Sequence, residues 1–395
     1  MRARGSVVLA VSTVAALSVA AGPVRKLLTN DERAALLALI NAVDVAQDTD
    51  VVTPVELPWS ADVLKSTDIA YVPFRLGLAS LPDGMKAAAM YVRVVSRHDG
   101  YRSTEQSSSL REWATRGGPQ PPARMETVVF SPGELPIGGP AVSSSRRGLA
   151  APAEASAVLA MHQKQYEQEK AAAEAQRRQQ ETERRDPYRF PFEEYYFFDA
   201  RGAAVERAMA IPPGEYDVFV GLVDRSRPKT STPLVIQHRV TVPDFWNLEL
   251  QLSNLMLVSD VRTLSAPLKP QEQIEHPYTW GRAQVIPIST PAFGRNDVLS
   301  VVYQICNYGA PDTDVTAEYN FYWRIAGDWK LFNHTQPQQF DNRDLPLAVG
   351  WETQGFVMQR VPLEPFAPGE YKLDVVVKDR LTRQTASQSI FFTVK

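Results

Sequence analysis

A segment that occurs twice is the feature of this sequence that most restricts its fold. Residues 211–216, Ile-Pro-Pro-Gly-Glu-Tyr, recur at 366–371 as Phe-Ala-Pro-Gly-Glu-Tyr. Asp224-Arg225 follows the first tyrosine at the same distance as Asp379-Arg380 follows the second. Self-similarity at a fixed offset indicates one structural unit built twice, and 395 residues exceed the usual size of one domain. The sequence therefore predicts two domains of one architecture.

Apolar residues occupy every second position after each repeated tyrosine, and a second alternating run ends each copy. The first copy has Val218, Val220 and Leu222, then His238, Val240 and Val242; the second has Leu373, Val375 and Val377, then Ile390, Phe392 and Val394. A period of two marks strands with one buried face. A Pro-Gly turn with a tyrosine at the start of such a strand is typical of a β-sandwich, where the hydroxyl can anchor the corner.

These patterns predict a mainly β fold with two immunoglobulin-like β-sandwich domains, a short N-terminal helix and a long helical insertion. We expect the first sandwich to combine residues 51–98 with 187–260, and the second to span 283–395. Residues 261–282 contain three prolines and few apolar residues, which is typical of a linker. Residues 99–186 are then an insertion at one edge of the first sandwich.

Two helices are expected outside the sandwiches. In the N-terminal segment 22–50, the capping residues at 29–32 precede an apolar pattern that predicts a helix over 30–47. The insertion is expected to begin as a flexible loop and to continue as one helix over 152–185, a stretch rich in strong helix formers. Its apolar residues lie only in the first half, so both a solvated helical arm and a partner-binding or self-pairing helix stay open.

The first residues have the layout of a secretory signal. Arg2 and Arg4 precede an uncharged apolar stretch, and small residues at Ala20 and Ala21 allow cleavage, so residues 1–21 are predicted to be a signal peptide. The chain is then exported, to the periplasm or the extracellular space, with no transmembrane span after cleavage. An uncleaved N-terminal anchor is the alternative, because the stretch approaches the length that spans a bilayer.

The sequence shows no constellation typical of catalysis. Lys and Arg (42) nearly balance Asp and Glu (45), which removes the electrostatic case for nucleic-acid binding. The single cysteine, Cys306, excludes an intrachain disulfide and a cysteine-cluster metal site. The five histidines lack metal-ligand spacing: His98, His162, His238, His276 and His334. Nucleophile-elbow and nucleotide-binding motifs are missing too, so we predict no catalytic residue, no cofactor and no metal site.

Three sets of acidic residues leave alternatives open. Asp312 and Asp314 could contribute oxygen ligands to a Ca²⁺ ion, although their spacing is incomplete and an ordinary turn explains them as well. Asp341 and Asp344 in a later loop have the same two interpretations. The repeated Asp-Arg pairs could act as acid and base, but duplication with a fold favours a structural turn, because an active site rarely occurs twice.

Aromatic residues are concentrated in 188–198 and 319–329. Packing in a core is the ordinary explanation, and a carbohydrate-binding or protein-binding platform is the other. The feature that separates the two is which set faces water: Tyr319, Phe321 and Trp323, or the alternate positions Asn320 and Tyr322.

Three stretches carry a family resemblance. Residues 57–60 (Leu-Pro-Trp-Ser), the Pro-Gly-Glu-Tyr strand, and 242–245 (Val-Pro-Asp-Phe) with the following 250–257 resemble the β-sandwich regions of exported bacterial proteins in the GWxTD and von Willebrand A-related groups. Residues 350–354 depart from the motif that names the first group, because Gln354 stands where that motif ends in Asp. The resemblance implies an exported sandwich protein and brings no catalytic residue with it.

Together these observations predict an exported, non-enzymatic and envelope-associated interaction or scaffold protein. It is expected to bind a protein partner by burying a sandwich edge or an aromatic face. A carbohydrate-binding or hydrolytic accessory module is the alternative function.

Overall fold

The computed structural model describes residues 28–66, 69–81, 85–97, 109–116, 168, 191–227, 230–288, 290–309, 312–345 and 354–395. The expected signal peptide (1–21) and the expected helix over 152–185, except Gln168, lie outside these residues. Within them the fold is mainly β, as predicted.

Three helices and twenty strands follow one another along the described chain. They are α1 (Asn30–Thr49), β1 (Trp59–Ala61), β2 (Leu64–Lys65), β3 (Ala70–Gly77), β4 (Ala87–Ser96), α2 (Ser109–Arg116), β5 (Phe192–Asp199), β6 (Ala204–Ile211), β7 (Gly214–Asp224), β8 (Leu234–Val242), β9 (Gln251–Leu252), β10 (Met256–Thr263), α4 (Pro270–Glu275), β11 (Thr279–Trp280), β12 (Ala283–Pro287), β13 (Ala292–Phe293), β14 (Val298–Cys306), β15 (Val315–Ile325), β16 (Asp328–His334), β17 (Gln338–Phe340), β18 (Gln354–Pro362), β19 (Gly369–Asp379) and β20 (Thr385–Val394).

The strands form four sheets. Sheet A has the order β1-β3-β2 with β6 also on β3, and sheet B has the order β5-β4-β7-β8. Sheet C has the order β11-β12-β10-β14-β18 with β9 on β14, and sheet D has the order β13-β20-β19-β15-β16 with β17 on β15. Except for the parallel pair β13 and β20, neighbouring strands are antiparallel.

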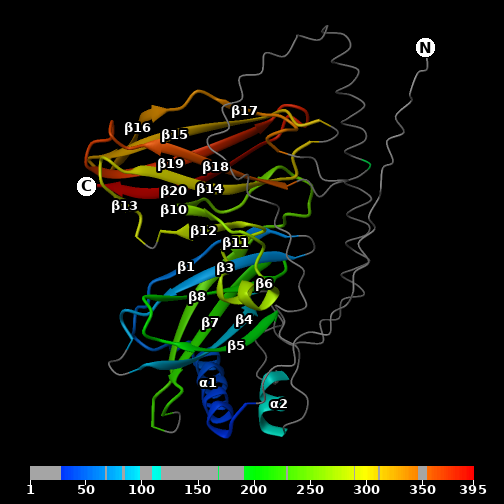
Figure 1. Ribbon diagram of the computed structural model, residues 1–395, viewed down its shortest axis with the longest axis vertical. Coiled ribbons are helices and arrows are strands. Elements are labelled where there is room, and N and C mark those ends of the chain that lie inside the picture. Colours follow the sequence, from blue (N-terminus) through cyan, green and yellow to red (C-terminus); the bar gives the residue numbers. More distant parts are fainter. Residues whose placement is uncertain are drawn as a thin grey trace, which may run out of the picture.

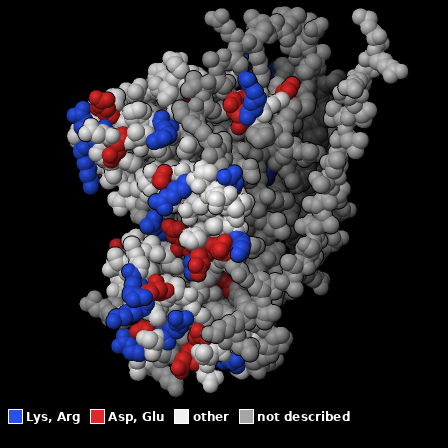
Figure 2. All heavy atoms as spheres, in the orientation of Figure 1, with Lys and Arg blue, Asp and Glu red and all other residues white. Residues whose placement is uncertain are grey.

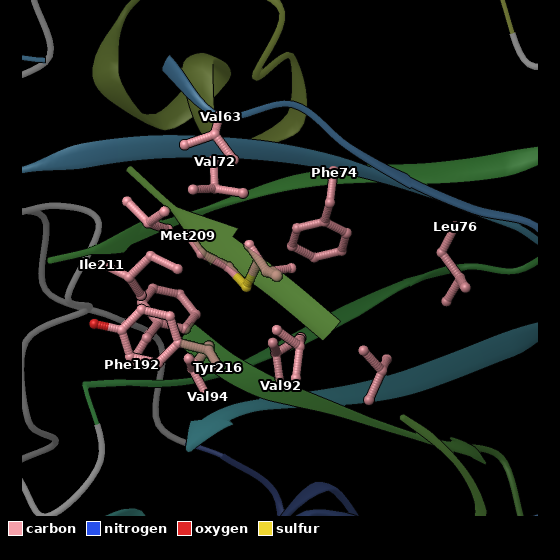
Figure 3. Packing of buried hydrophobic residues seen from close by; sticks show 14 of the residues in the cluster. Val63, Val72, Phe74, Leu76, Val92, Val94, Phe192, Met209, Ile211 and Tyr216 are labelled. Atoms are coloured by element: carbon pink, nitrogen blue, oxygen red, sulfur yellow. The ribbon is translucent and has the colours of Figure 1, made fainter. Parts of the chain in front are cut away.

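Sheets A and B enclose the first core. Val72 and Phe74 of β3 and Met209 of β6 meet Val92 of β4 and Tyr216 of β7 in one buried cluster. Figure 3 shows these side chains pointing towards one another from the two sheets. The alternation in β3 and β7 places every second side chain in this core, so the two sheets form a β-sandwich.

Sheets C and D enclose the second core. Val301 and Tyr303 of β14 face Tyr319 of β15 and Leu373 and Val375 of β19. The hydroxyls of Tyr303 and Tyr319 lie 2.9 Å apart, so two buried polar groups satisfy each other. This second pair of sheets is also a sandwich.

The outer faces of sheets A and C pack directly against each other. Tyr71 of sheet A lies in one cluster with Trp280, Val302 and Phe356 of sheet C, and the rings of Trp280 and Phe356 stack at 4.7 Å. The Tyr71 hydroxyl donates to the carbonyl of Pro277 at 2.7 Å. The four sheets therefore form a single stack in the order B, A, C, D, with α1 and α2 on the outer side of sheet B (Figure 1).

Strand pairing corrects the predicted end of the first sandwich. Residues 251–260 were expected there and 261–282 as a linker, but β9 and β10 pair with β14, and β10 also pairs with β12. Leu257 is buried in the second core and Val258 in the contact between sheets A and C. Alternation shows that this stretch is a strand, but a local pattern does not show which sheet the strand joins.

The predicted N-terminal helix is α1, two residues longer than expected. Thr29 and Glu32 form the expected capping box, and Leu36 and Leu39 pack on the outer face of sheet B. Arg93 of β4, buried beneath the helix, donates to Asp44 at 2.6 Å. The first part of the insertion was expected to be a flexible loop. There, residues Ser109–Arg116 form α2, which packs in the same cluster as α1.

The two repeated tyrosines have matching surroundings. β7 and β19 have the same length and lie in the middle of sheets B and D. The hydroxyl of Tyr216 donates to the carbonyl of Pro212 at 2.9 Å, and that of Tyr371 donates to Ala367 at 2.8 Å. Each tyrosine thus ties the start of its strand to the turn four residues earlier.

Removing either hydroxyl should destabilise the protein. We expect Tyr216→Phe and Tyr371→Phe each to lower the free energy of unfolding by about 1 kcal/mol, because a partly buried carbonyl loses its donor while the ring stays in place. Urea unfolding followed by tryptophan fluorescence measures the change. Tyr322→Phe, on an outer face, is the matched control, and a Tyr371→Phe protein as stable as this control would contradict the anchoring role.

Candidate functional site

The outer face of sheet D carries a row of large side chains that crosses four strands. Leu331 of β16 lies opposite Tyr322 of β15, which lies opposite Lys372 of β19, which lies opposite Phe391 of β20. Directly opposed residues of antiparallel strands project to the same face. Leu331 is 59% exposed and Phe391 is 55% exposed. We call these four residues, together with Trp329 of β16, the aromatic platform.

Contacts between rings and cations hold the platform in shape. The rings of Trp329 and Phe391 lie 5.5 Å apart and are tilted by 46°. The Lys372 ammonium lies 4.4 Å from the centre of the Tyr322 ring, and the Arg324 guanidinium lies 5.9 Å from that of Trp329. Such contacts reduce side-chain freedom before a ligand arrives, which lowers the entropic cost of binding.

Charges on this face are paired. Each of three cations has a carboxylate within ion-pair distance, so the face has no excess of one sign among these groups. The pairs are Lys372–Asp374 at 2.8 Å, Arg324–Glu370 at 2.7 Å and Lys378–Glu318 at 2.7 Å. Figure 2 shows basic and acidic residues interspersed over the described part of the visible surface. This arrangement does not favour a polyanion such as nucleic acid.

The corresponding face at the other end of the stack is covered. Tyr91 of β4 and Phe219 and Val223 of β7 project from the outer side of sheet B and are buried beneath α1. Sheet D presents its platform to solvent instead, as the exposed Leu331 and Phe391 show. Exposed large apolar side chains grouped on one face are typical of a recognition surface.

The structure answers the question raised by the second aromatic stretch. Tyr319 and Phe321 are buried in the second core, and Trp323 packs at its edge, so these three belong to the inner set. Tyr322 projects outward. Neither Phe391 nor Leu331 was predicted from the sequence. Phe391 stands at a polar position of the alternation in β20, and an apolar residue at such a position indicates an exposed apolar side chain.

The first aromatic stretch is mostly internal. Phe192, Tyr195 and Tyr196 of β5 are buried, whereas Tyr188 and Phe190 lie outside the described residues. Tyr195 packs on Trp113 of α2 with ring centres 6.3 Å apart. This stretch therefore supplies packing to the first half of the stack.

The acidic residues considered for calcium have protein partners. Asp312 accepts from the Asn342 amide at 3.1 Å, and Asp314 accepts from Gln339 at 3.1 Å. Asp341 accepts from Arg343, and Asp344 accepts from the backbone of Asp341. Among the described residues, no group of three His, Cys, Asp or Glu side chains is placed to hold a metal ion.

The repeated aspartates support turns. Asp224 and Asp379 are each 1% exposed at the end of β7 and β19. Asp224 accepts from the backbone N–H of Ser226 at 2.9 Å, and Asp379 accepts from that of Leu381 at 2.9 Å. These contacts agree with the structural interpretation of the duplicated pairs.

The three described histidines and the cysteine lie on different elements and form no common site with one another. His238 lies on β8, His276 follows α4 and His334 ends β16, while His98 and His162 lie outside the described residues. Cys306 is fully buried, and burial raises the pKa of its thiol to about 12. A thiol with that pKa is a poor nucleophile at neutral pH.

Asp62 has a strongly shifted pKa near the contact of sheets A and C. Burial raises the pKa of its carboxyl to about 7, while a hydrogen bond from the Tyr278 hydroxyl, 3.1 Å away, opposes the shift. Shifted groups often mark active sites, but structural networks shift pKa values as well. Because Tyr278 is buried in the same apolar cluster as Tyr71 and Trp280, we assign this pair to the contact between sheets.

Comparison with known proteins identifies no family. No family model and no curated protein matches this chain. Among solved structures, the CARDB domain of a Pyrococcus furiosus protein in complex with di-metal ions is 12% identical, with a TM-score of 0.17 over 27% of this chain and 81% of that one. The residues 350–354 compared above with a named motif lie outside the described residues, except Gln354.

Two other structural matches are similarly distant. Bacteroides uniformis beta-glucuronidase 2 is 8% identical, with a TM-score of 0.24 over 82% of this chain and 26% of that one. The alkylpurine DNA glycosylase AlkC of Pseudomonas fluorescens is 10% identical, with a TM-score of 0.19 over 27% of each chain. This chain thus spans about a quarter of both proteins.

In the described part of the chain, no helix has the length and apolar character needed to cross a membrane.

The Asp62 carboxyl should make stability depend on pH. Its pKa is higher in the folded state than the usual 3.8, so its favourable contribution is complete below about pH 4 and is lost as the pH rises through about 7. We expect Asp62→Asn to raise the free energy of unfolding at pH 8 by roughly 1–2 kcal/mol and to have little effect at pH 4.

Urea unfolding of both proteins from pH 4 to pH 8 measures this difference. Asp260→Asn is the matched control, because Asp260 is exposed and paired with Arg262 on the surface. A wild-type protein and an Asp62→Asn variant with parallel pH profiles would show that the carboxyl titrates normally.

Proposed function

We propose that this chain is an exported, non-enzymatic interaction or scaffold protein of the cell envelope, which binds a protein partner through the aromatic platform. The observation that carries the proposal is the exposure of Leu331 and Phe391 on a face that ring and cation contacts hold in shape. Tyr and Trp in such a setting provide large contact areas at low conformational cost, which protein interfaces use repeatedly.

Export is supported by residues 1–21, whose basic start and apolar stretch have the layout of a secretory signal. In this proposal the two sandwiches are immunoglobulin-like repeats, and residues 99–186 are an insertion with a helical arm. The position of the insertion supports this, because it connects β4 to β5, whereas only Ala326 and Gly327 connect β15 to β16 in the second half.

The charges and apolar side chains of the platform indicate which kind of partner surface it binds. Lys372 and Arg324 are already paired with carboxylates, so a charged partner surface gains little from them. An apolar or aromatic surface with a polar rim buries Phe391 and Leu331 and leaves these ion pairs intact. We therefore expect a neutral protein surface as the partner.

A carbohydrate-binding or hydrolytic accessory module is the second candidate. Exposed Phe391 and the partly exposed Trp329 beside it favour sugar binding in principle, because aromatic rings can pack on a sugar ring. The tilt of 46° between the rings does not provide a flat surface for two adjacent sugars. Protein binding therefore accounts better for the site.

Two substitutions on the platform should abolish partner binding without unfolding the chain. We expect Leu331→Ser combined with Phe391→Ser to reduce capture of a defined envelope protein at least tenfold, because each removed side chain is worth about 1 kcal/mol or more when buried. Crosslinking of the purified chain to envelope extracts, quantified by mass spectrometry, measures capture.

Val45→Ser is the matched control, because Val45 is 61% exposed on α1, at the other end of the stack. The same protein should be captured by the wild type and by this control. Binding to a glycan array that disappears in the platform variant, with no captured protein, would replace the proposal by the carbohydrate alternative.

Export has its own test. Expression of the full chain in a Gram-negative host, followed by N-terminal sequencing of the periplasmic fraction, should give a mature start after Ala20 or Ala21. Arg2→Glu combined with Arg4→Glu should retain the precursor in the cytoplasm. A membrane-bound chain that keeps Met1 would support the uncleaved anchor instead.

A further inference from the structure

A groove runs along one edge of sheet B, at the end of the molecule away from the platform. It has a volume of about 660 Å³ and lies between the extended segment 52–58 and strand β8. Leu57 and Ile236 are buried residues of its lining, and Pro54 and Pro58 are exposed residues of its wall. The groove thus has apolar and polar lining residues and lies beside an edge strand.

The backbone of β8 is available at this edge. Thr53 already uses it: its N–H donates to the Val235 carbonyl at 2.8 Å, and the Val235 N–H donates to the Thr53 hydroxyl at 2.9 Å. In an antiparallel ladder, alternate residues point their N–H and C=O to the same side. Gln237, Arg239 and Thr241 therefore point these groups away from β7, and no hydrogen bond from the described residues reaches them.

The inner side of this edge presents an unsatisfied polar atom. The His238 ring stacks on Trp59 with centres 4.6 Å apart, and its Nε2 is buried without a hydrogen-bond partner among the described residues. Burial also lowers the pKa of the imidazole, so the ring is neutral at pH 7. A hydroxyl or amide N–H that comes within hydrogen-bond distance of this nitrogen would satisfy it.

The outer side of the same edge carries two arginines beside one shared carboxylate. Arg97 lies 2.8 Å and Arg239 lies 3.9 Å from the single carboxylate of Asp217. Two guanidinium groups thus share one carboxylate, and Arg239 is 75% exposed. Glu56 lines the opposite part of the groove, and Glu215 lies opposite Thr241 on the outer face, so a negative charge is favoured only beside the Arg239 guanidinium.

We propose that this groove binds an extended peptide of a partner protein, which adds as a strand to the β8 edge, with apolar or hydroxyl side chains towards Ile236 and His238 and an acidic side chain beside Arg239. The unpaired peptide groups of β8 supply main-chain hydrogen bonds, and the two sides of the edge supply the sequence preference. This inference does not depend on the platform, which lies on a different sheet.

The probe is an eight-residue fluorescein-labelled peptide that alternates valine and threonine, with one threonine replaced by glutamate. Fluorescence anisotropy with the full chain should show binding that is roughly tenfold tighter than for the same peptide with lysine in place of glutamate. Gln237→Pro should weaken binding at least tenfold, because proline removes the outward N–H but leaves the β7–β8 ladder intact.

Ser389→Pro is the matched control. Ser389 lies on β20 at the position that corresponds to Gln237 on β8, on the side of β20 where β13 pairs only with Thr393 and Val394. Peptide binding should be unchanged in this variant, and circular dichroism should show the same melting temperature for both proline variants.

Charge reversal gives a second readout if Gln237→Pro unfolds the chain. Arg239→Glu, at an exposed side chain, should reverse the preference so that the lysine peptide binds more tightly. The proposal is overturned if neither peptide binds, if a folded Gln237→Pro binds like wild type, or if Ser389→Pro alone reduces binding. Loss of binding in the platform variant would instead place the peptide on sheet D.

Discussion

The packing of sheet A against sheet C is the contact on which the rest of the structure depends. A sheet of a two-layer sandwich ordinarily leaves its outer face to solvent. Here Tyr71 of sheet A is buried with Trp280 and Phe356 of sheet C, so that both outer faces are covered at once. The two cores consequently lie in one continuous stack, and the surfaces left for recognition are at its ends and edges.

Polar groups within this contact fix how the two halves meet. The ammonium of Lys65, a residue 1% exposed, donates to Asn307 at 2.6 Å, and its backbone N–H donates to Gln304 at 2.8 Å. The Gln304 amide donates back to the Lys65 carbonyl at 3.0 Å. Buried polar groups cost free energy when they lose their partners, so a shifted arrangement of the sheets would be penalised.

The stack also explains why the two ends differ. Sheet B would present Tyr91 and Phe219 to water, but α1 covers them and Arg93 ties the helix to the sheet through Asp44. On sheet D, by contrast, Phe391 is 55% exposed, and no described helix packs on that face. In the same way, Thr53 pairs with one position on the edge of β8, and no other described residue pairs with the rest of that edge. The two proposed partner surfaces, the outer face of sheet D and the edge of β8, are thus parts of the sheets that the described residues leave uncovered.

Local patterns in the sequence determined the strands, the capped helix α1 and the anchoring tyrosines. These features depend on neighbours within a few residues: Thr29 reaches Glu32, and Tyr371 reaches Ala367. Part of the candidate site could also be predicted from the sequence, since the alternation places Tyr322 and Tyr319 on opposite faces of one strand. Only the tertiary structure decided that β10 joins sheet C, that sheets A and C cover each other, that Phe391 is exposed, and that no described residue hydrogen-bonds the outward peptide groups of Gln237. The physical reason is that a period of two shows which side chains share a face, whereas the element that covers this face comes from residues far away in the chain.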